Sequence, residues 1–353
     1  MKSEKRIAVA LSGGIDSSVA AWILQNQGYD VTGITMRHFD DSEMGFAPDN
    51  GIDAVVLQAK KDCDFLKIPH IVIDVQQKFS DIVVSDFVNE YQNGRTPNPC
   101  TLCNRTIKWG AFLNEIIALG FEMMATGHYI SKEFSNDKYH LFRSGDMRKD
   151  QSYMLWQLNQ QQLAKTLFPL AHKTKSQARE IITENNIPVQ IDIESQEICF
   201  ISNHYSDLLE KKMEFKQGNI VLTSGEIIGK HLGLPLYTIG QRKGLHTSLN
   251  DVLYVKELDM TNNRLIVTKD QNELLRSEFY IRKLNWIADI PENDCPDLLV
   301  QIRYNSTAVE VAYLDYREDS LRVVLKNPVR AVTPGQSAVF YCKDELLGGG
   351  VID

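Results

Sequence analysis

The sequence predicts an α/β protein in which a doubly wound parallel sheet precedes a small mainly-β unit and a C-terminal β-barrel. In the first two hundred residues, short apolar runs alternate with longer helical patterns. From Gly218 the pattern changes to short strands with turns, and the last eighty residues alternate strictly between apolar and polar side chains. Strands separated by helices form parallel sheets, whereas evenly spaced strands and turns form barrels. We therefore expect three domains: 1–203, 204–273 and 274–353.

The individual elements of the first domain follow from apolar periodicity. Runs rich in β-branched and small residues predict buried strands, and spacings of three and four predict helices. The expected strands are Arg6–Ser12, Asp30–Met36, His70–Val75 and Glu122–Tyr129. The expected helices are Ser17–Gly28, Ile52–Leu66, Phe79–Tyr91 and one that starts near Asn104 and ends at Gly120.

Composition limits the classes of function. The 353 residues are 43% hydrophobic and carry a formal net charge of −8, values of an ordinary globular protein. No apolar run approaches the ~18 residues that a membrane helix needs, so we expect no membrane association. The N-terminus enters a strand almost at once, which predicts a cytoplasmic protein whose thiols stay reduced. The acidic balance disfavours a broad nucleic-acid surface but leaves room for local basic patches.

A glycine-rich stretch, "ALSGGIDSS" (Ala10–Ser18), follows the first strand and opens the first helix. Ligands bind there in parallel α/β sheets, and two adjacent glycines let the backbone approach a phosphate closely. The serines add hydroxyl donors, and Asp16 is suited to hold Mg²⁺ or to cap the helix. The stretch lacks the GK[ST] ending of a Walker loop and the spacing of a dinucleotide fold. It resembles the SGGxDS signature of PP-loop ATP pyrophosphatases, which transfer AMP to an oxygen.

Further motifs narrow this resemblance to one family. They run in order through all three expected domains, and they are "GRTPNP…LCNRTIKW", "ATGHY", "KDQSYML", "ESQEICFI", "YTIGQRKGL" and "AVTPGQSAVFY…LGGGVI". Together they resemble the tRNA-specific 2-thiouridylases. The resemblance implies ATP-dependent adenylation of C2 of the wobble uridine in the anticodon of certain tRNAs, followed by sulfur transfer. A cysteine desulfurase or a sulfur-relay protein would supply the sulfur as a persulfide.

The resemblance assigns the two central thiols. Cys103 in "LCNRTIKW" is the implied nucleophile, and Cys199 in "EICFI" is the implied persulfide carrier. Such a thiol should be partly exposed and kept as thiolate, for example by Lys108, Arg105 or a helix N-terminus. A helix that starts near Asn104 would place Cys103 at about its N-cap and lower its pKa. For Cys63, Cys295 and Cys342 we expect the role of small buried hydrophobic residues.

Cys100 departs from the family pattern. Asp is expected at this position (N-P-D-x-x-C), where its carboxylate could assist proton transfer or orientation. Zinc is disfavoured because the C-x-x-C pair supplies two ligands and no second close pair exists, although Cys199 could supply a third. Cys100, Cys103 and Cys199 could instead hold an iron–sulfur cluster that delivers sulfide. The preferred alternative is a persulfide relay with disulfide chemistry, in which Cys100 is a spare or resolving thiol.

The resemblance also implies the remaining contacts. Met36, at the end of the second strand, should contact the adenine of ATP. The target uridine must leave the base stack of the anticodon before its C2 can be reached. The implied ATP-binding residues are Ala10, Leu11, Ser12, Gly13, Gly14, Ile15, Asp16, Ser17, Met36 and Gly127. The implied tRNA-binding residues are Asn98, Pro99, Cys100, His128, Lys149, Asp150, Gln151, Arg303, Tyr304 and Gln336, with Arg and Tyr suited to bind phosphate or stack on bases.

Two other classes remain open at this point. A PP-loop synthetase that acts on a small molecule would explain the loop and the sheet, but not the paired cysteines or the appended barrel. An RNA-binding module with an inactive nucleotide site would have lost Asp16 or the serines of the loop, and these are intact. ATP–pyrophosphate exchange stimulated by tRNA, but not by small amides, separates the three classes.

Overall fold

The N-terminal domain is built on a five-stranded parallel sheet. The computed structural model describes residues 5–47, 51–189, 198–245, 247, 249, 251–291, 295 and 297–353. The strand order is β3-β2-β1-β4-β7. From β1 the chain adds β2 and β3 on one side and then crosses to add β4 and β7 on the other side, so the strand order reverses at β1. Its strands are β1 (Arg6–Ala10), β2 (Asp30–Arg37), β3 (His70–Asp74), β4 (Met123–Ala125) and β7 (Thr166–Leu167). Ile7, Ala8 and Val9 are completely buried, as a central strand covered on both faces requires. Ligands bind where such a sheet reverses its order, at the carboxyl ends of β1 and β4.

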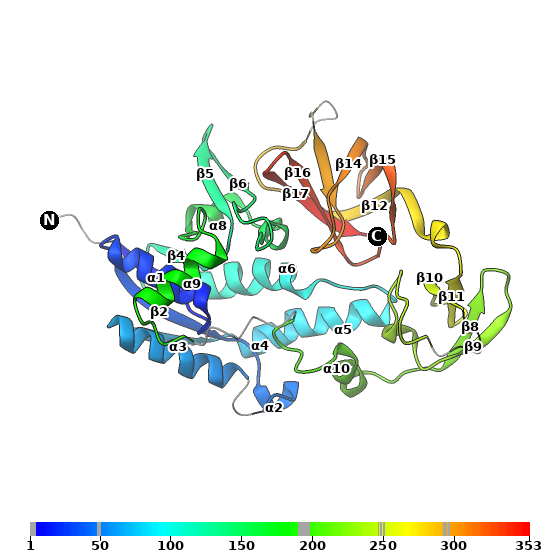
Figure 1. Ribbon diagram of the computed structural model, residues 1–353, viewed down its shortest axis with the longest axis horizontal. Helices are drawn as coiled ribbons and strands as arrows, with labels where there is room; N and C mark the ends of the chain where they lie inside the picture. Colours follow the sequence, from blue (N-terminus) through cyan, green and yellow to red (C-terminus); the bar gives the residue numbers. More distant parts are fainter. Residues whose placement is uncertain are drawn as a thin grey trace.

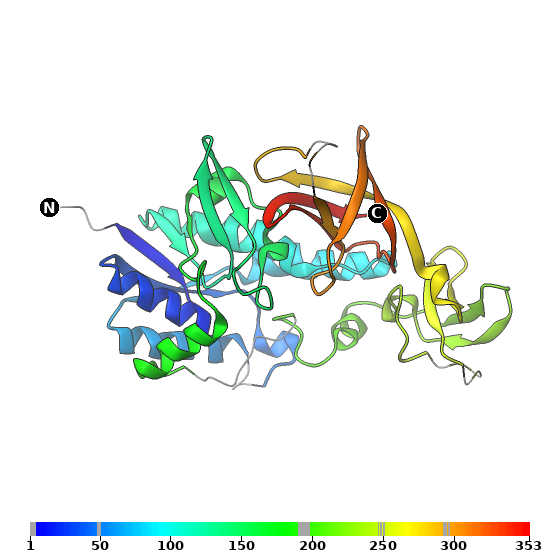
Figure 2. The same cartoon turned by 45° about the horizontal axis from the view of Figure 1, so that its top comes forward.

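Helices cover this sheet and extend beyond it (Figure 1). Those at the sheet are α1 (Ile15–Asn26), α2 (Asp41–Met44), α3 (Ile52–Leu66), α8 (Gln160–Ala164) and α9 (Lys175–Glu184), with a 3-10 turn at Ser152–Leu155. Two longer helical stretches, each with a π-helical middle, run side by side beneath the barrel in Figures 1 and 2. One comprises α4 (Gln76–Phe79), Ser80–Val84 and α5 (Ser85–Gln92); the other comprises α6 (Pro99–Cys103), Asn104–Phe112 and α7 (Leu113–Ala118).

The expected start of the second long helix near Asn104 is wrong. The helix begins at Pro99, five residues earlier, and Asn98 is its N-cap, whose Oδ1 accepts a hydrogen bond from the Cys100 N–H at 3.2 Å. Proline is favoured at the first helical position because its fixed φ suits a helix and its missing N–H would have had no intrahelical partner. The double-proline stretch therefore starts the helix, and Cys103 lies inside it rather than at its N-cap.

The C-terminal domain is the expected closed β-barrel. Six strands run in the order β12-β15-β14-β13-β16-β17, and pairing of β12 with β17 closes the ring. They are β12 (Leu275–Trp286), β13 (Leu298–Gln301), β14 (Val309–Tyr316), β15 (Leu321–Arg330), β16 (Ser337–Cys342) and β17 (Glu345–Ile352). A hairpin of the first domain, β5 (Ser131–Ser135) and β6 (Lys138–Phe142), extends this sheet, because β6 pairs with the start of β17. The first domain and the barrel thus share one hydrogen-bonded sheet.

The central region is a separate four-stranded sheet at the far end from the parallel sheet (Figure 1). Its order is β10-β11-β8-β9, with strands β8 (Gly218–Leu222), β9 (Ile227–His231), β10 (Tyr254–Asp259) and β11 (Arg264–Thr268). Helix α10 (Tyr205–Lys212) precedes it, and 3-10 turns lie at Leu234–Leu236 and Gln271–Leu274. Within the described residues, no helix has the length and apolar character needed to cross a membrane.

Candidate nucleotide and thiol site

The glycine-rich loop joins β1 to α1 and is shaped by its own side chains. Gly13 has φ 67°, and a Cβ there would lie 2.9 Å from the Cβ of Gln58, so both the dihedral and the space call for glycine. The Ser12 N–H donates to Ser17 Oγ at 3.2 Å, and Ser17 Oγ donates to the Gly14 carbonyl at 3.0 Å. The N-cap residue of α1 is Gly14, which offers no side-chain cap. The first N–H groups of α1 are therefore left to an anionic ligand.

Asp16 does not cap the helix but is held by two side chains from later segments. Its carboxylate oxygens accept from Lys175 Nζ at 2.7 and 2.8 Å, and Oδ1 also accepts from Tyr129 Oη at 2.7 Å. Lys175 opens α9 and is only 16% exposed. The pKa of Tyr129 is raised by burial and by Asp16, so the phenol remains a donor. Sequence reasoning missed Lys175, because nothing in its local pattern links it to a loop 159 residues away.

Gly127 ties the end of β4 to this loop. A Cβ at Gly127 would lie 2.6 Å from the carbonyl carbon of Asp16 and 2.7 Å from the Ser17 nitrogen, so only glycine allows the two backbones this approach. Met36, at the end of the neighbouring strand β2, is half-buried. The residues expected to bind ATP therefore converge from the first helix and the ends of β1, β2 and β4.

The thiols of Cys100 and Cys103 lie one helical turn apart on α6, and both are half-buried. Burial raises the pKa of Cys103 to about 12, and the neighbouring Cys100 adds to this effect, while Lys108 acts against it. Burial likewise raises the pKa of Cys100. The expected lowering of the Cys103 pKa is therefore wrong, since desolvation of the thiolate outweighs the attraction of Lys108.

Cys199 reaches the same place from a segment almost a hundred residues later. Its side chain is exposed, and its pKa is raised by desolvation first and then by Cys103 and Cys100. Lys108 opposes that shift, as it does for both other thiols. The three sequence-predicted cysteines therefore interact with one another and with one lysine. Of the motif "ESQEICFI", the residues before Ile198 lie outside the described part of the chain.

His38 contacts one of these thiols, and His128 is, like them, influenced by Lys108. His38 Nε2 is 3.4 Å from Cys199 Sγ, a contact that sequence reasoning missed. His128 is held by a hydrogen bond between its Nδ1 and Thr126 Oγ1 at 2.9 Å, and its ring lies 5.3 Å from that of Trp109. Burial and Lys108 lower the pKa of His128 well below its usual range, so the ring is neutral. His128 therefore offers a hydrogen-bonding edge rather than a positive charge.

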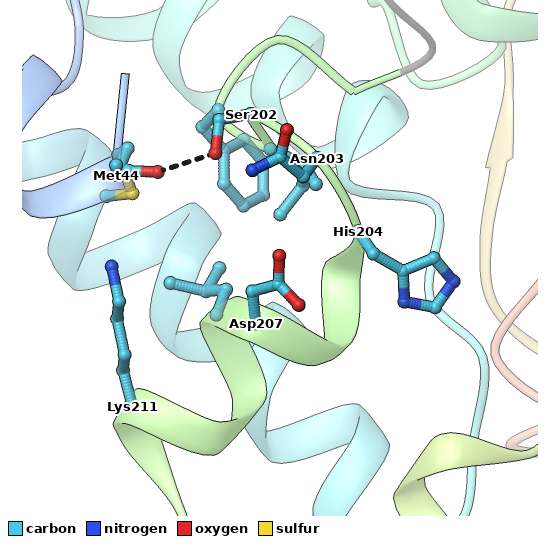
Figure 3. Close-up of a pocket in the computed structure, with 10 residues that line it drawn as sticks. Met44, Ser202, Asn203, His204, Asp207 and Lys211 are labelled. Atoms are coloured by element: carbon cyan, nitrogen blue, oxygen red, sulfur yellow. Dashed lines mark hydrogen bonds between the residues drawn. The ribbon is translucent and has the colours of Figure 1, made fainter. Parts of the chain in front are cut away.

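The chain that continues from Cys199 lines a pocket of about 240 Å³ (Figure 3). One side is the turn after α2, where the Met44 carbonyl accepts a hydrogen bond from Ser202 Oγ at 3.3 Å. The other side is α10, from which Asp207 and Lys211 face the pocket. The Cys199 segment is thus packed between α2 and α10.

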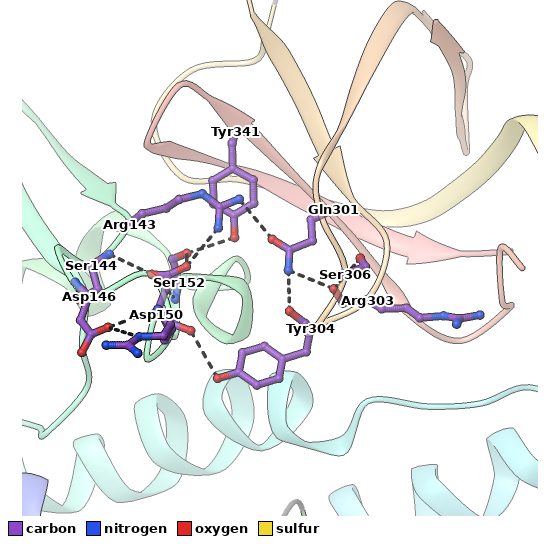
Figure 4. Close-up of polar contacts among 11 residues, drawn as sticks. Arg143, Ser144, Asp146, Asp150, Ser152, Gln301, Arg303, Tyr304, Ser306 and Tyr341 are labelled. Carbon is purple, nitrogen blue, oxygen red and sulfur yellow. Dashed lines mark hydrogen bonds and ion pairs between the residues drawn. The ribbon is translucent and has the colours of Figure 1, made fainter. Parts of the chain in front are cut away.

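The segment Lys149–Gln151 is anchored to the barrel (Figure 4). The Asp150 side chain is only 6% exposed and accepts from Arg143 and from Ser152 Oγ at 2.6 Å. The Asp150 carbonyl accepts from Tyr304 Oη at 3.3 Å, and Gln151 Oε1 accepts from the Tyr129 N–H at 3.0 Å. The Asp150 and Gln151 side chains therefore hold the loop in place, and Lys149 beside them is half-buried.

The polar side chains of two barrel residues, Arg303 and Gln336, also have protein partners. Arg303 Nη2 donates to Thr333 Oγ1 at 2.8 Å and to the Ala331 carbonyl, and the desolvation of its guanidinium lowers its pKa. Gln336 Nε2 donates to the Thr96 carbonyl at 2.8 Å, and Thr96 lies shortly before the start of α6. Asn98 caps that helix and Pro99 is buried in its first turn. The barrel thus positions the segment that carries Cys100 and Cys103.

The remaining cysteines divide into two groups. Cys63 is fully buried, as a small hydrophobic residue would be. Cys295 and Cys342 are half-buried, with their Sγ atoms 3.2 Å apart in the barrel.

Comparison with known proteins decides the family. Models described as the tRNA methyl transferase HUP domain, the tRNA methyl transferase PRC-barrel domain and the aminomethyltransferase beta-barrel domain match residues 5–203, 206–269 and 276–352. The chain is 42% identical to "tRNA-specific 2-thiouridylase MnmA 2" of Thermoanaerobacter sp., which covers 100% of this chain and 99% of the relative. The chain belongs to the tRNA-specific 2-thiouridylase family.

Other members give the same result over the whole chain. "tRNA-specific 2-thiouridylase MnmA" of Natranaerobius thermophilus is 42% identical, covering 100% of this chain and 98% of the relative. "tRNA-specific 2-thiouridylase MnmA 2" of Clostridium botulinum is 39% identical, covering 98% of each. The match to the HUP domain implies the use of ATP, and family membership implies a tRNA substrate.

Proposed function

We propose that this protein is a tRNA 2-thiouridylase that adenylates C2 of the wobble uridine with ATP and then replaces the oxygen with sulfur carried by Cys199. The observation that carries the proposal is that Cys103 and Cys199, from distant segments, interact with each other and with Lys108 in a chain related over its full length to 2-thiouridylases. The C2 oxygen is a poor leaving group, and transfer of AMP to it turns it into a good one.

The steps balance as follows. The C2 oxygen attacks the α-phosphorus of ATP and pyrophosphate leaves. The outer sulfur of the Cys199 persulfide attacks C2 and AMP leaves, so C2 is joined to Cys199 through two sulfur atoms. The Cys103 thiolate then attacks Cys199 Sγ, which releases 2-thiouridine and leaves a Cys103–Cys199 disulfide. A dithiol reductant restores both thiols, and a cysteine desulfurase or sulfur-relay protein reloads Cys199.

The residues around the nucleotide loop support ATP binding but do not fit Mg²⁺ held by Asp16. Both oxygens of that carboxylate already accept from Lys175. A cation there would meet the ammonium at contact distance, which like charges oppose. We therefore assign the positive charge near the ATP phosphates to Lys175 and the first N–H groups of α1, and we route no step through a metal.

For the iron–sulfur alternative, the three cysteines are suitable ligands by type, but they are not arranged around a common metal position. A cluster needs several thiolates gathered around the iron atoms. In the described ranges, which include Cys100, Cys103 and Cys199, no three His, Cys, Asp or Glu side chains form a group that could hold a metal ion. The persulfide relay is therefore the mechanism that we propose.

For tRNA we propose an inner surface rather than a broad basic face. His128 would meet the target base as a neutral ring, because its lowered pKa keeps it uncharged. Asn98, Pro99 and Cys100 would border that base from the start of α6. Arg303, Tyr304 and Gln336 would act mainly by holding the loops that face it, since their polar atoms already have protein partners.

The test has two readouts. With tRNA present, the purified protein should catalyse exchange of labelled pyrophosphate into ATP, whereas small amides should have no effect. With a persulfide donor added, mass spectrometry of digested tRNA should show 2-thiouridine at the wobble position. Exchange that depends on a small amide instead of tRNA would contradict the proposal and favour a small-molecule synthetase.

A further inference from the structure

His38 lies between the nucleotide strand and the sulfur-carrying cysteine. It follows β2 by one residue, and its ring is fixed by edge contacts with Phe39 at 4.7 Å and Phe79 at 5.0 Å between centroids. Its Nδ1 is 3.2 Å from the Met36 carbonyl oxygen, and its Nε2 is 3.4 Å from Cys199 Sγ. Both ring nitrogens are therefore engaged, one by the backbone and one by the thiol.

The Met36 carbonyl determines which nitrogen carries the proton. A carbonyl oxygen only accepts, so Nδ1 must be the N–H donor of the neutral ring, and Nε2 is left with a lone pair. A lone pair at Nε2 accepts the hydrogen bond of the Cys199 S–H. The geometry thus places a proton acceptor on the sulfur atom that has to become a nucleophile.

Burial keeps the ring of His38 neutral. Burial lowers the pKa of His38 to about 4, and Lys108 adds to this effect, while the Met36 carbonyl and Asp41 act in the opposite direction. The ring is therefore an unprotonated acceptor throughout the physiological range.

The thiol needs such an acceptor. The pKa of Cys199 is raised by desolvation and by Cys103 and Cys100, so its sulfur is protonated at neutral pH, with only Lys108 favouring the thiolate among these neighbours. The thiolate is the form that attacks a sulfur atom. Sulfur loading at neutral pH therefore requires that the proton leave as the new bond forms.

We propose that His38 is a further catalytic residue, which takes the proton of the Cys199 thiol as Sγ attacks the outer sulfur of a donor persulfide. This role rests on the proposed function. A bond forms between Cys199 Sγ and the outer sulfur, the donor S–S bond breaks, and the donor leaves as a thiolate. His38 then returns the proton to that thiolate, so a thiol and a persulfide give a persulfide and a thiol without an external oxidant. As a weak base, His38 holds the proton only during the transfer.

The test measures loading of Cys199 by glutathione persulfide, with the added sulfur detected by mass spectrometry of intact protein. His38→Asn keeps a polar group near Met36 but removes the basic nitrogen. At pH 7 its loading rate should fall roughly 10²-fold, the usual size of general-base catalysis. His172→Asn is the matched control, because His172 is exposed in the turn between β7 and α9.

The pH profile separates catalysis from positioning. The wild-type rate should vary little between pH 6.5 and 8, whereas the His38→Asn rate should rise about tenfold per pH unit with the thiolate fraction and approach the wild-type rate near the thiol pKa. His38→Ala should in addition be rescued by free imidazole, which has room in the vacated space. Equal ATP affinity and melting temperature in the three proteins show that the fold is intact.

The outcomes distinguish this role from the proposed function. A wild-type Cys199 that takes up no sulfur overturns the relay and the role of His38 together. Loading of His38→Asn at the wild-type rate overturns the role of His38 alone. A loss by the same factor at every pH, without imidazole rescue, shows that the ring only positions the thiol and also overturns it.

Discussion

The nucleotide loop and the thiol cluster lie in one domain but are built in opposite ways. The backbone of the loop is shaped mainly by local contacts: Ser12 and Ser17 bond within the loop, and its anion-binding groups are the first N–H groups of the helix that follows. The cluster is assembled from the end of β2, the helix that starts at Pro99 and the segment at Cys199. A short motif can therefore specify the backbone of the first site, to which later segments add Lys175 and Gly127, whereas the second site exists only in the folded chain.

The two sites also prepare their chemistry differently. Around the loop, positive and negative groups are already paired, as in Lys175 with Asp16. In the cluster, burial keeps the thiols protonated, and the pKa of Cys103 reaches about 12. Binding at the loop needs no proton transfer, but each thiol must lose a proton when it reacts. Protonated thiols also react slowly with oxidants, so the raised pKa values of these thiols would protect the cysteines between turnovers.

The largest expected effect separates the two sites. Cys199→Ser and Cys103→Ser should each abolish 2-thiouridine formation, because a hydroxyl can neither carry a persulfide nor form the disulfide. Neither change touches the glycine-rich loop, so tRNA-dependent ATP–pyrophosphate exchange should stay near the wild-type rate. Mass spectrometry of tRNA and the exchange assay measure the two outcomes. Undiminished thiolation in Cys199→Ser would refute the relay assignment.

A change at the loop should give the converse result. In Gly127→Ala the new Cβ would lie 2.6 Å from the carbonyl carbon of Asp16, so the strand end and the loop must separate. We expect ATP affinity to fall by at least about tenfold and the free energy of unfolding by about 1–3 kcal/mol, as for overpacked sites. Sulfur loading of Cys199 by glutathione persulfide should remain measurable.

The control for this change is Gly145→Ala. A Cβ at Gly145 meets no atom within 4 Å, so its ATP affinity and stability should match those of the wild type. Isothermal titration with ATP and urea unfolding measure both quantities. Equal behaviour of the two alanine variants would contradict the close approach of β4 to the loop.

The contrast between the nucleotide loop and the thiol cluster also explains which features could be predicted from the sequence. The expected helix Ile52–Leu66 agrees with α3, and the parallel sheet and barrel were predicted from periodicity alone. The start of the helix at Pro99 was predicted five residues too late, because proline favours turns as well as the first position of a helix and the sequence alone does not decide between them. His38 was missed because it contacts a cysteine 161 positions away, and neither residue carries a local mark of the other. The hairpin of β5 and β6 did carry a signal in the sequence, which is the pair Asn136 and Asp137. Asn and Asp are favoured where a two-residue turn requires positive φ, and both residues have positive φ in the structure.

A smaller effect is expected at Cys100, where this chain departs from the family pattern. Cys100→Asp introduces the residue that the family resemblance leads us to expect at this position, and it leaves Cys103 and Cys199 to transfer sulfur. We expect activity within about threefold of the wild type, because a carboxylate in this half-buried position costs desolvation but regains the acid/base group. Iron and sulfide analysis after anaerobic purification should give zero in both proteins. Stoichiometric iron and sulfide in the wild type, lost together with activity in Cys100→Asp, would establish the cluster instead.

The smallest expected effect concerns the support that the barrel gives to the helix that starts at Pro99 and carries Cys100 and Cys103, here called the thiol helix. Gln336→Ala removes the hydrogen bond from Nε2 to the Thr96 carbonyl at 2.8 Å, worth about 1 kcal/mol of unfolding free energy. Gly335 should keep the two segments in register, because its backbone packs against that of Thr96 and the Thr96 N–H donates to the Pro334 carbonyl at 2.8 Å. Thiolation should therefore slow by only a few-fold while pyrophosphate exchange stays unchanged, because the thiol helix loosens and the loop does not.

The exposed Gln161→Ala is the control and should change neither rate. A parallel loss of both activities in Gln336→Ala would mean that the barrel supports the whole domain rather than the thiol helix.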